Sequence, residues 1–387
     1  MGARQHLAII GDGAVAAAFL SVARLVPGDR LTLIGPNVHR FGAGRFYADH
    51  DARHPWRLAY LLDRPNGEMT EGFADWLAAE WPVLLPEIAV AQPLHVRRWS
   101  EALSEGAFGD FAAPRAIYGR YLARRSSERL AKLVEDGVQV QLITGLATDL
   151  SRADDQFRIT LASGEVIKAD RVDVATGGPA NQRFGVDAGP TAFTTLHGNE
   201  DAIARVLKPG WEVTCLGAST EVLDVMHFLR AAWPTQELRL RVLRDRATPA
   251  LDGDPEYRRL RAAGRIVEEV GRPIWVYAES AGNVRLRITG KECQSQEKTV
   301  PLAINTAGPG DQLLVDILIS GMIAKGWLKL NSAQNRIDVG ARFATDMDGV
   351  RYASDAVAIL NRRPEGVVRQ RVEELVGSFE GDPIETA

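Results

Sequence analysis

The chain opens with a short apolar stretch that is followed at once by glycine. Residues 6–10 are mostly hydrophobic and run into Gly-Asp-Gly, a pattern typical of a buried strand that enters a tight turn. Residues 14–25 are rich in Ala, Leu and Val and contain no helix breaker, and residues 30–34 suit a second strand. The start of the chain therefore predicts a strand–helix–strand unit of an α/β protein.

The stretch that follows is less regular. Residues 35–64 are rich in Gly, His, Arg and aromatic side chains and lack a period, which is typical of irregular backbone that lines a site. Apolar spacing predicts helices over residues 69–81 and 114–135. Short strands are predicted at residues 138–143, 146–150, 157–161 and 166–174. The first would extend a parallel sheet, the middle ones suit a small antiparallel meander, and the last runs into Ala-Thr-Gly-Gly.

The opening pattern returns in the second half of the chain. A strand over 211–216, a turn at Gly217-Ala218-Ser219 and a helix over 220–232 form a second unit of the same type. The elements expected after it are strands at 238–243, 284–288, 300–305 and 356–360, and helices at 258–270, 313–324 and 365–376. The last of these resemble the first unit more than the second. We therefore expect an α/β fold with two Rossmann-like dinucleotide-binding domains of the three-layer β/β/α type, one over residues 1–180 and 300–387 and the other inserted over 190–299.

Composition and charge restrict the classes of partner that the protein is expected to have. The 387 residues suit two domains, and 46 basic against 50 acidic residues give a net charge of −4. Nucleic-acid binding needs a basic excess, so no nucleic-acid partner is expected. No apolar run is long enough for a membrane span, and a strand that begins at residue 6 leaves no room for a signal peptide. We therefore expect a cytoplasmic protein whose partner is a small-molecule substrate.

The cysteine content bears on metal binding and on disulfide formation. Cys215 and Cys293 are too few for a four-ligand zinc site, so no metal is expected. A disulfide between them is an alternative, but a reduced pair of thiols is favoured.

The first glycine turn has the spacing of a dinucleotide site. Gly11 permits the tight turn, Gly13 lets a pyrophosphate approach the backbone, and Ala16 is small enough for the helix to pack on the strand. The helix beginning at Ala14 offers free amides and a positive dipole end to the phosphates. The second strand ends at Gly35, where an acidic residue that binds the ribose hydroxyls is expected.

The segment Pro-Arg-Ala-Ile-Tyr-Gly-Arg-Tyr-Leu at residues 114–122 resembles bacterial FAD/NAD(P)-binding proteins related to FAD-dependent urate hydroxylase. It is more distantly similar to the N-hydroxylating monooxygenases of ornithine and lysine. The resemblance continues through residues 138–163 into Ala175-Thr176-Gly177, and Gly42-x-Gly44 with Tyr47 is similar to the family's glycine-aromatic segment beside the flavin.

The resemblance implies FAD in the first domain, NADPH or NADH in the second, and oxidation or hydroxylation of a small molecule. The residues expected at the cofactor sites are Gly11, Gly13, Ala14, Ala16, Gly44, Arg45, Arg115, Thr148, Thr176 and Gly177, with Gly217, Ser219 and Gly308 beyond them. Ser219 stands where the family has glycine, and its Cβ would crowd a pyrophosphate. Whether the second site still binds its nucleotide is therefore open.

Other candidate residues have two interpretations each. His54 and Trp56 suit substrate binding, or simple surface and packing roles, which we favour for each residue singly. Arg45 suits a phosphate contact or an exposed loop, and residues 244–246 (Arg-Asp-Arg) suit nucleotide selection or a charged loop. Residues 362–365 are favoured as a helix boundary rather than a cap beside the flavin.

No catalytic side chain is singled out, because a flavin carries its own redox chemistry. Three functions remain. The leading one is an NAD(P)H-dependent flavin monooxygenase. The second is an FAD-linked dehydrogenase or oxidase that needs no NAD(P)H. The third is a nucleotide-binding sensor or partner protein without turnover.

Overall fold

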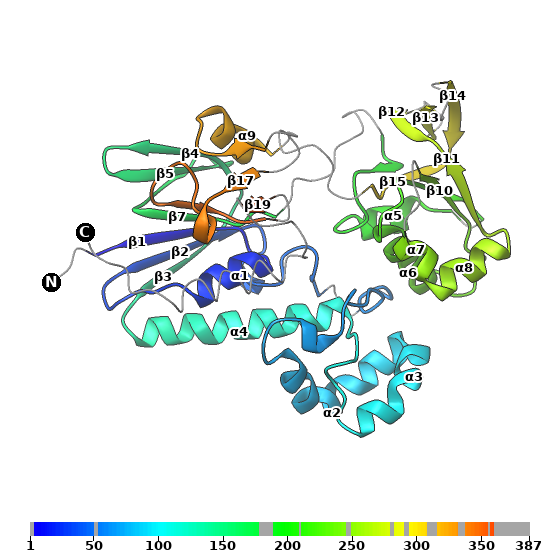
Figure 1. Cartoon of the computed structure of the whole chain (residues 1–387), viewed down its shortest axis with the longest axis horizontal. Coiled ribbons are helices and arrows are strands. Elements are labelled where there is room, and N and C mark those ends of the chain that lie inside the picture. Colours follow the sequence, from blue (N-terminus) through cyan, green and yellow to red (C-terminus); the bar gives the residue numbers. More distant parts are fainter. Residues whose placement is uncertain are drawn as a thin grey trace. The chain divides into compact units, whose positions relative to one another are not determined.

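The computed structural model describes residues 4–49, 53–177, 189–208, 210–244, 249–278, 282–289, 294–307, 316–331, 337–354 and 357–359. These residues form two compact units (Figure 1). The first contains the described residues of 4–49, 61–177 and 316–359. The second contains those of 53–60 and 189–307. No helix in the described ranges combines the length and apolar character that crossing a membrane requires.

The first unit is built on a parallel sheet of five strands in the order β18-β7-β1-β2-β3. Its strands are β1 (His6–Ile10), β2 (Arg30–Gly35), β3 (Gln139–Thr144), β7 (Arg171–Val174) and β18 (Val350–Tyr352). All of β1 is buried, because both faces of the sheet are covered. Ile10 pairs with Ile34 on one side and with Val174 on the other, so the ends of three strands meet at the glycine turn.

Two layers cover this sheet. Helices α1 (Ala14–Ser21) and α4 (Arg115–Glu135) lie on one face. The antiparallel meander of β4 (Ala147–Ala153), β5 (Gln156–Leu161) and β6 (Val166–Ala169) lies on the other (Figure 1). One core cluster contains residues of all three layers, among them Phe19, Ile9 and Phe157. The three-layer β/β/α architecture is therefore confirmed for this unit.

Smaller elements complete the first unit. They are the helices α2 (Phe73–Ala91), α3 (Pro93–Ser104) and α9 (Ile317–Ala324), the short turns η1 (Val38–Arg40), η2 (Asn66–Glu68) and η3 (Ala341–Phe343), and the strands β16 (Lys329–Leu330), β17 (Ile337–Val339) and β19 (Val357–Ile359). α2 is longer than predicted and accommodates Pro82 and Pro86, and α3 begins on Pro93, where proline is favoured.

The second unit repeats the plan. Its parallel sheet has the order β11-β10-β9-β15-β8, and the meander β12-β13-β14 accompanies it. The strands are β8 (Ala192–Phe193), β9 (Val213–Leu216), β10 (Leu240–Arg244), β11 (Ile266–Val270), β12 (Arg272–Ala278), β13 (Val284–Thr289), β14 (Ser295–Val300) and β15 (Leu302–Asn305). The helices are α5 (Glu200–Val206), α6 (Glu221–Ala232), α7 (Pro249–Gly253) and α8 (Pro255–Ala262).

Three sequence predictions are corrected. The helix expected over 258–270 ends at Ala262, and Gly264 with a φ of 71° precedes β11, which pairs with β10. The single strand expected over 166–174 is two strands in different sheets. They are separated at Asp170, whose Oδ2 accepts a hydrogen bond from the His6 amide over 2.7 Å.

The third correction concerns the return of the chain to the first domain. Residues 302–305 were expected there, but β15 pairs with β9 and lies in the second sheet. Residues 53–60 also belong to the second unit. Both assignments depend on contacts between segments far apart in the sequence. The final helix expected at 365–376 lies outside the described residues.

Candidate dinucleotide site

The glycine turn at the end of β1 admits no side chain at its first position. Gly11 has a φ of 121°, and a Cβ atom there would lie 2.1 Å from the carbonyl oxygen of Ala175. Its amide donates to the Ile34 carbonyl over 2.8 Å. Only glycine satisfies both the backbone angle and this close approach. The turn therefore lies between the ends of β2 and β7.

A second glycine segment lies directly on this turn. The amides of Gly42 and Gly44 both donate to the Asp12 carbonyl, over 2.8 and 3.1 Å. A Cβ on Gly44 would lie 2.8 Å from the Cα of Gly13. The two glycine motifs therefore form one surface of bare backbone at the start of α1.

The start of α1 is suited to an anion. Gly13 is its N-cap, no side chain caps it, and its first turn contains no acidic residue. Ala16 is fully buried, so the helix packs closely on the sheet as its spacing predicted. The unpaired amides of a helix start and its dipole favour negative charge.

The end of β7 adds a polar group to the same place. The hydroxyl of Thr176 is buried and has no hydrogen-bond partner in the described part of the chain. A Cβ on Gly177 would meet nothing within 4 Å. A buried hydroxyl that lacks a hydrogen-bond partner in the protein is expected to bind a polar group of a ligand. Together with the bare backbone at Gly13 and Gly44, it fits the phosphates of a dinucleotide.

The structure explains the motif at residues 114–122. A Cβ on Gly119 of α4 would lie 2.0 Å from the Tyr47 carbonyl oxygen, so this glycine permits the loop to rest on the helix. The ring of Tyr118 lies 5.0 Å from that of Tyr47. Arg115 is buried with its guanidinium 4.3 Å from the centre of the Phe46 ring. The motif thus positions the segment that carries Gly44.

One candidate residue of the turn escaped the sequence-based reasoning. Asp12, between the two glycines, is only 8% exposed, and its Oδ2 accepts a hydrogen bond of 2.5 Å from the Asn37 amide. A Cβ on Gly35 would lie 2.8 Å from the Asp12 Cβ. Burial raises the pKa of Asp12, whereas the hydrogen bond from the Asn37 amide and the positive charge of Arg45 oppose that rise. The sequence contained two signals for this residue. They are an acid between the two glycines of the turn, and the lack of an acid at Gly35, where the ribose-binding acid is expected.

Two predicted residues lie away from the bare backbone surface formed by Gly11, Gly13 and Gly44. Thr148 lies in the meander, where its hydroxyl donates to the Thr160 carbonyl over 3.2 Å. Arg45 is exposed. Its charge acts on Asp12 but it does not enter the buried part of the turn.

The second glycine turn has the same backbone and different chemistry. Gly217 has a φ of 107°, and its Cβ would lie 2.4 Å from the Ala307 Cα. The Ser219 hydroxyl accepts from the Glu221 amide over 3.2 Å, and the Ser219 amide donates to the Thr306 carbonyl over 3.1 Å. The amides of Ser219 and Glu221 at this turn are therefore already engaged.

The first turn of α6 is also acidic. It contains Glu221 and Asp224, whereas the first turn of α1 contains no acid. Glu221 accepts from the Thr195 hydroxyl over 2.7 Å and from the Leu196 amide over 2.9 Å, and burial raises its pKa. A carboxylate beside the helix start disfavours a second anion.

Trp56 is part of the core of the second unit. It is 6% exposed and its ring lies 5.2 Å from that of Phe228. His54 stacks on Trp56 at 4.8 Å and pairs with Asp201 over 3.3 Å. These contacts support the packing interpretation of both residues over substrate binding.

Of the remaining candidates, two lie in the described part of the chain and the others lie outside it. Arg244 pairs with Glu268 over 3.2 Å. Cys215 is buried, and burial raises the pKa of its thiol. Asp245, Arg246, Cys293, Gly308 and residues 362–365 lie outside the described residues.

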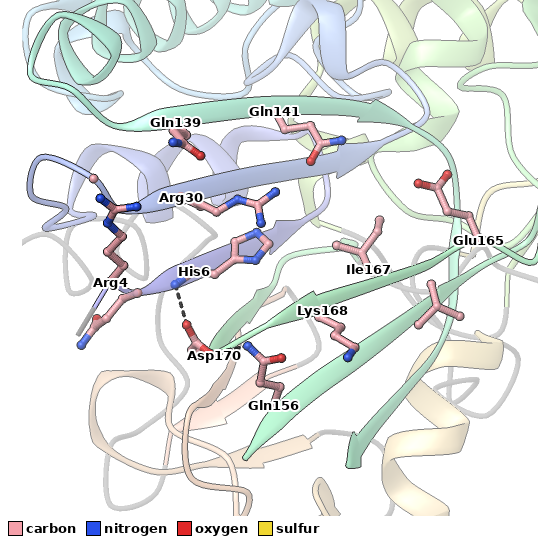
Figure 2. Close-up of a pocket in the computed structure, with 13 residues that line it drawn as sticks. Arg4, His6, Arg30, Gln139, Gln141, Gln156, Glu165, Ile167, Lys168 and Asp170 are labelled. Atoms are coloured by element: carbon pink, nitrogen blue, oxygen red, sulfur yellow. Dashed lines mark hydrogen bonds between the residues drawn. The ribbon is translucent and has the colours of Figure 1, made fainter. Parts of the chain in front are cut away.

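A polar cavity of about 450 Å³ lies elsewhere in the first unit (Figure 2). Arg4, His6, Arg30 and Lys168 line it. His6 and Arg30 stand at the amino ends of β1 and β2, whereas α/β proteins bind dinucleotides beyond the carboxyl ends of their strands. This cavity is therefore separate from the glycine turn.

The fold defines a protein with two Rossmann-type units, each an α/β domain with a parallel sheet. The glycine turn of the first unit fits a dinucleotide. Residues 8–179 match the protein-family model described as FAD-NAD(P)-binding. Over these residues the first unit is similar to that family. No curated protein matches the chain by sequence.

Solved structures extend the likeness to the whole chain. A lysine monooxygenase from Nocardia farcinica is 13% identical with a TM-score of 0.59, and the match covers 96% of this chain and 99% of that one. An ornithine N-hydroxylase from Kutzneria sp. 744 is 12% identical with a TM-score of 0.56, covering 98% and 99%. A thioredoxin reductase from Lactococcus lactis is 12% identical with a TM-score of 0.53, covering 97% and 99%. The chain shares the fold of these proteins.

Proposed function

We propose that this protein is an FAD-dependent oxidoreductase that binds FAD in its first unit. The observation that carries the proposal is the cradle at the end of β1, where Gly11, Gly13 and Gly44 keep the backbone bare beside an uncapped helix. The match of residues 8–179 to an FAD-NAD(P)-binding model supports it independently.

The residues of the first unit have distinct tasks in this proposal. Gly13, Gly44 and the start of α1 would hold the pyrophosphate, and the Thr176 hydroxyl would donate a hydrogen bond to the bound group. Gly119 and Tyr118 would hold the loop that closes the site. FAD supplies the redox chemistry, so the chain binds, orients and shields it.

The leading reaction is hydroxylation of a small molecule with NAD(P)H as reductant. Structural neighbours named as a lysine monooxygenase, an ornithine N-hydroxylase and a cadaverine monooxygenase support this choice at the level of the fold. These amines, together with uric acid, which the sequence resemblance suggests, form the first panel of substrates. NAD(P)H would bind in the second unit, at the turn that contains Gly217.

A specific observation favours a second candidate. Ser219 and the acidic first turn of α6 are unfavourable to a pyrophosphate at that turn. An FAD-linked dehydrogenase or oxidase needs no NAD(P)H, because its substrate reduces the flavin directly. The same chemistry at the second turn is compatible with a nucleotide-binding sensor that lacks turnover.

One experiment separates these functions. The purified protein is examined anaerobically by its flavin absorbance, with NADPH, NADH or each panel compound added in turn. Bleaching by a nicotinamide nucleotide supports the monooxygenase. Bleaching by a substrate alone supports the dehydrogenase or oxidase. A protein that holds FAD but is bleached by neither supports the sensor.

The binding claim has its own control. Gly11→Val would force a side chain against the Ala175 carbonyl, whereas Gly253→Ala places a methyl group where nothing lies within 4 Å. We expect the first variant to lose FAD and the second to retain it. Wild-type protein that binds no FAD under any reconstitution condition would contradict the proposal.

A further inference from the structure

We propose that the carboxylate of Asp12 replaces the missing acid at the end of β2 and binds the adenosine ribose hydroxyls of the dinucleotide. The inference rests on the proposed function, because it concerns the same site. It assigns a specificity-determining residue to a position inside the glycine turn, where the ribose-binding acid of this fold is not expected.

The first step is the location of the carboxylate. Asp12 follows β1, but its side chain reaches across to β2. The Asp12 Oδ2 would lie 2.8 Å from a Cβ on Gly35, and it accepts a hydrogen bond from the amide of Asn37, two residues further on. The end of β2 is where Rossmann domains place the acid that binds ribose. The charge is therefore present at the expected place and comes from a different strand.

The second step is mutual exclusion. Any side chain at position 35 would place its Cβ 2.8 Å from the Asp12 Cβ and 2.9 Å from the Asp12 Cγ. Real Cβ atoms do not approach other carbons so closely, so an acid at position 35 and Asp12 in its present conformation cannot coexist. Glycine at position 35 is thus the condition that lets Asp12 occupy this place, rather than a simple loss of the ribose contact.

The third step is the capacity of the carboxylate for a ligand. An ionised carboxylate accepts about four hydrogen bonds. In the described part of the chain, the Asn37 amide is the only donor from another residue that reaches it. Burial raises the pKa of this carboxyl, and the positive charge of Arg45 opposes that rise. Two vicinal hydroxyl groups match the unused acceptor sites, and hydrogen bonds to a charged acceptor are the stronger kind.

A purely structural role is the competing explanation, because the Asn37 bond ties the turn to the loop after β2. That role needs one acceptor oxygen but no ribose. It predicts that the loss of Asp12 weakens the binding of every adenine nucleotide equally, with or without hydroxyl groups on the sugar.

The test compares ADP with 2′,3′-dideoxy-ADP on flavin-free full-length protein by titration calorimetry. Wild-type protein should prefer ADP by about tenfold or more, as expected for hydrogen bonds to a charged group. Asp12→Ala should bind the two nucleotides equally. Asp12→Asn keeps an oxygen for the Asn37 amide and serves as the folding control, with the preference for ADP reduced.

A paired substitution sharpens the test. Gly35→Asp alone should impair nucleotide binding, because it collides with Asp12. The double variant Asp12→Ala with Gly35→Asp should regain a preference for ADP of several-fold, since the acid has returned to β2. A well-folded Asp12→Ala protein that retains the wild-type preference would overturn the inference while leaving FAD binding intact. Wild-type protein that binds neither FAD nor ADP would instead refute the proposed function on which the inference rests.

Discussion

The carbonyl oxygen of Tyr47 lies 2.0 Å from the position of a Cβ on Gly119, so the backbones of loop and helix meet directly at this point. This contact holds the loop that brings Gly44 against Gly13. It ties the motif on α4 to the glycine turn after β1, although the two are distant in the sequence.

Replacing Gly119 should therefore weaken cofactor binding without any direct contact to the cofactor. The methyl group of Gly119→Ala must displace Tyr47, and overpacking of this kind costs about 1–3 kcal/mol. We expect FAD affinity, measured by quenching of flavin fluorescence, to fall by about tenfold. Gly253→Ala, in open space, is the matched control. Equal affinity in both variants would show that the loop position does not matter.

The buried ion pair between β7 and β18 should be a strong determinant of stability. Arg351 Nε donates to Asp173 Oδ1 over 2.6 Å, with both side chains largely buried, and the guanidinium lies 4.8 Å from the centre of the Phe19 ring. Asp173→Ala leaves an uncompensated buried charge, which typically costs about 3–5 kcal/mol. Urea unfolding should reveal that loss.

The control for this measurement is an exposed pair. Arg239 contacts Glu237 at the surface, so Arg239→Ala should leave the unfolding midpoint nearly unchanged. If Asp173→Ala behaves like that control, β18 is not held to the first sheet by charge.

Trp56 distinguishes packing from substrate binding. Because it is buried against Phe228 in the second unit, Trp56→Ala should reduce the free energy of unfolding by about 3–5 kcal/mol. The neighbouring change His54→Ala removes a half-exposed ring and should have a small effect. A fully stable Trp56→Ala protein with a raised substrate KM would revive the substrate-binding interpretation.

His6 should make the stability of the first unit depend on pH. Burial, followed by the charge of Arg30, lowers its pKa from the usual 6.5. The unfolded chain then binds the proton more readily, so the free energy of unfolding should decline as pH falls below about 6.5. Once pH is below the folded-state pKa, this decline should level off.

The variant His6→Gln provides the comparison for this pH dependence. Glutamine retains a polar group toward Thr32, whose hydroxyl lies 2.8 Å from the His6 Nε2, but it does not titrate. Denaturation curves at pH 5 and 7.5 should differ less for the variant than for the wild type. Identical pH dependence in the two proteins would assign the effect to other groups.

The second glycine turn gives a test of NAD(P)H use. Ser219→Gly removes the Cβ and frees the Glu221 amide from the serine hydroxyl. If NADPH or NADH binds there, its KM in anaerobic flavin reduction should fall several-fold. An unchanged KM would favour the oxidase or dehydrogenase.

Local sequence determined the elements that depend on short-range pattern. β1, α4 and the glycine turn at Gly11 were predictable, because apolar periodicity and glycine's φ freedom act within a few residues. The order of strands in each sheet was not, and neither was the partition of residues 302–305 and 53–60, since both depend on pairing and burial between distant segments.

The same distinction applies to the site. The bare backbone at Gly11 and Gly13 followed from spacing, but the approach of Gly44, the burial of Trp56 and the reach of Asp12 toward Gly35 were decided by tertiary structure. A sequence specifies which side chains exist and what each segment prefers. Only packing decides which of them occupy the same space, because steric exclusion and desolvation act between atoms and not along the chain.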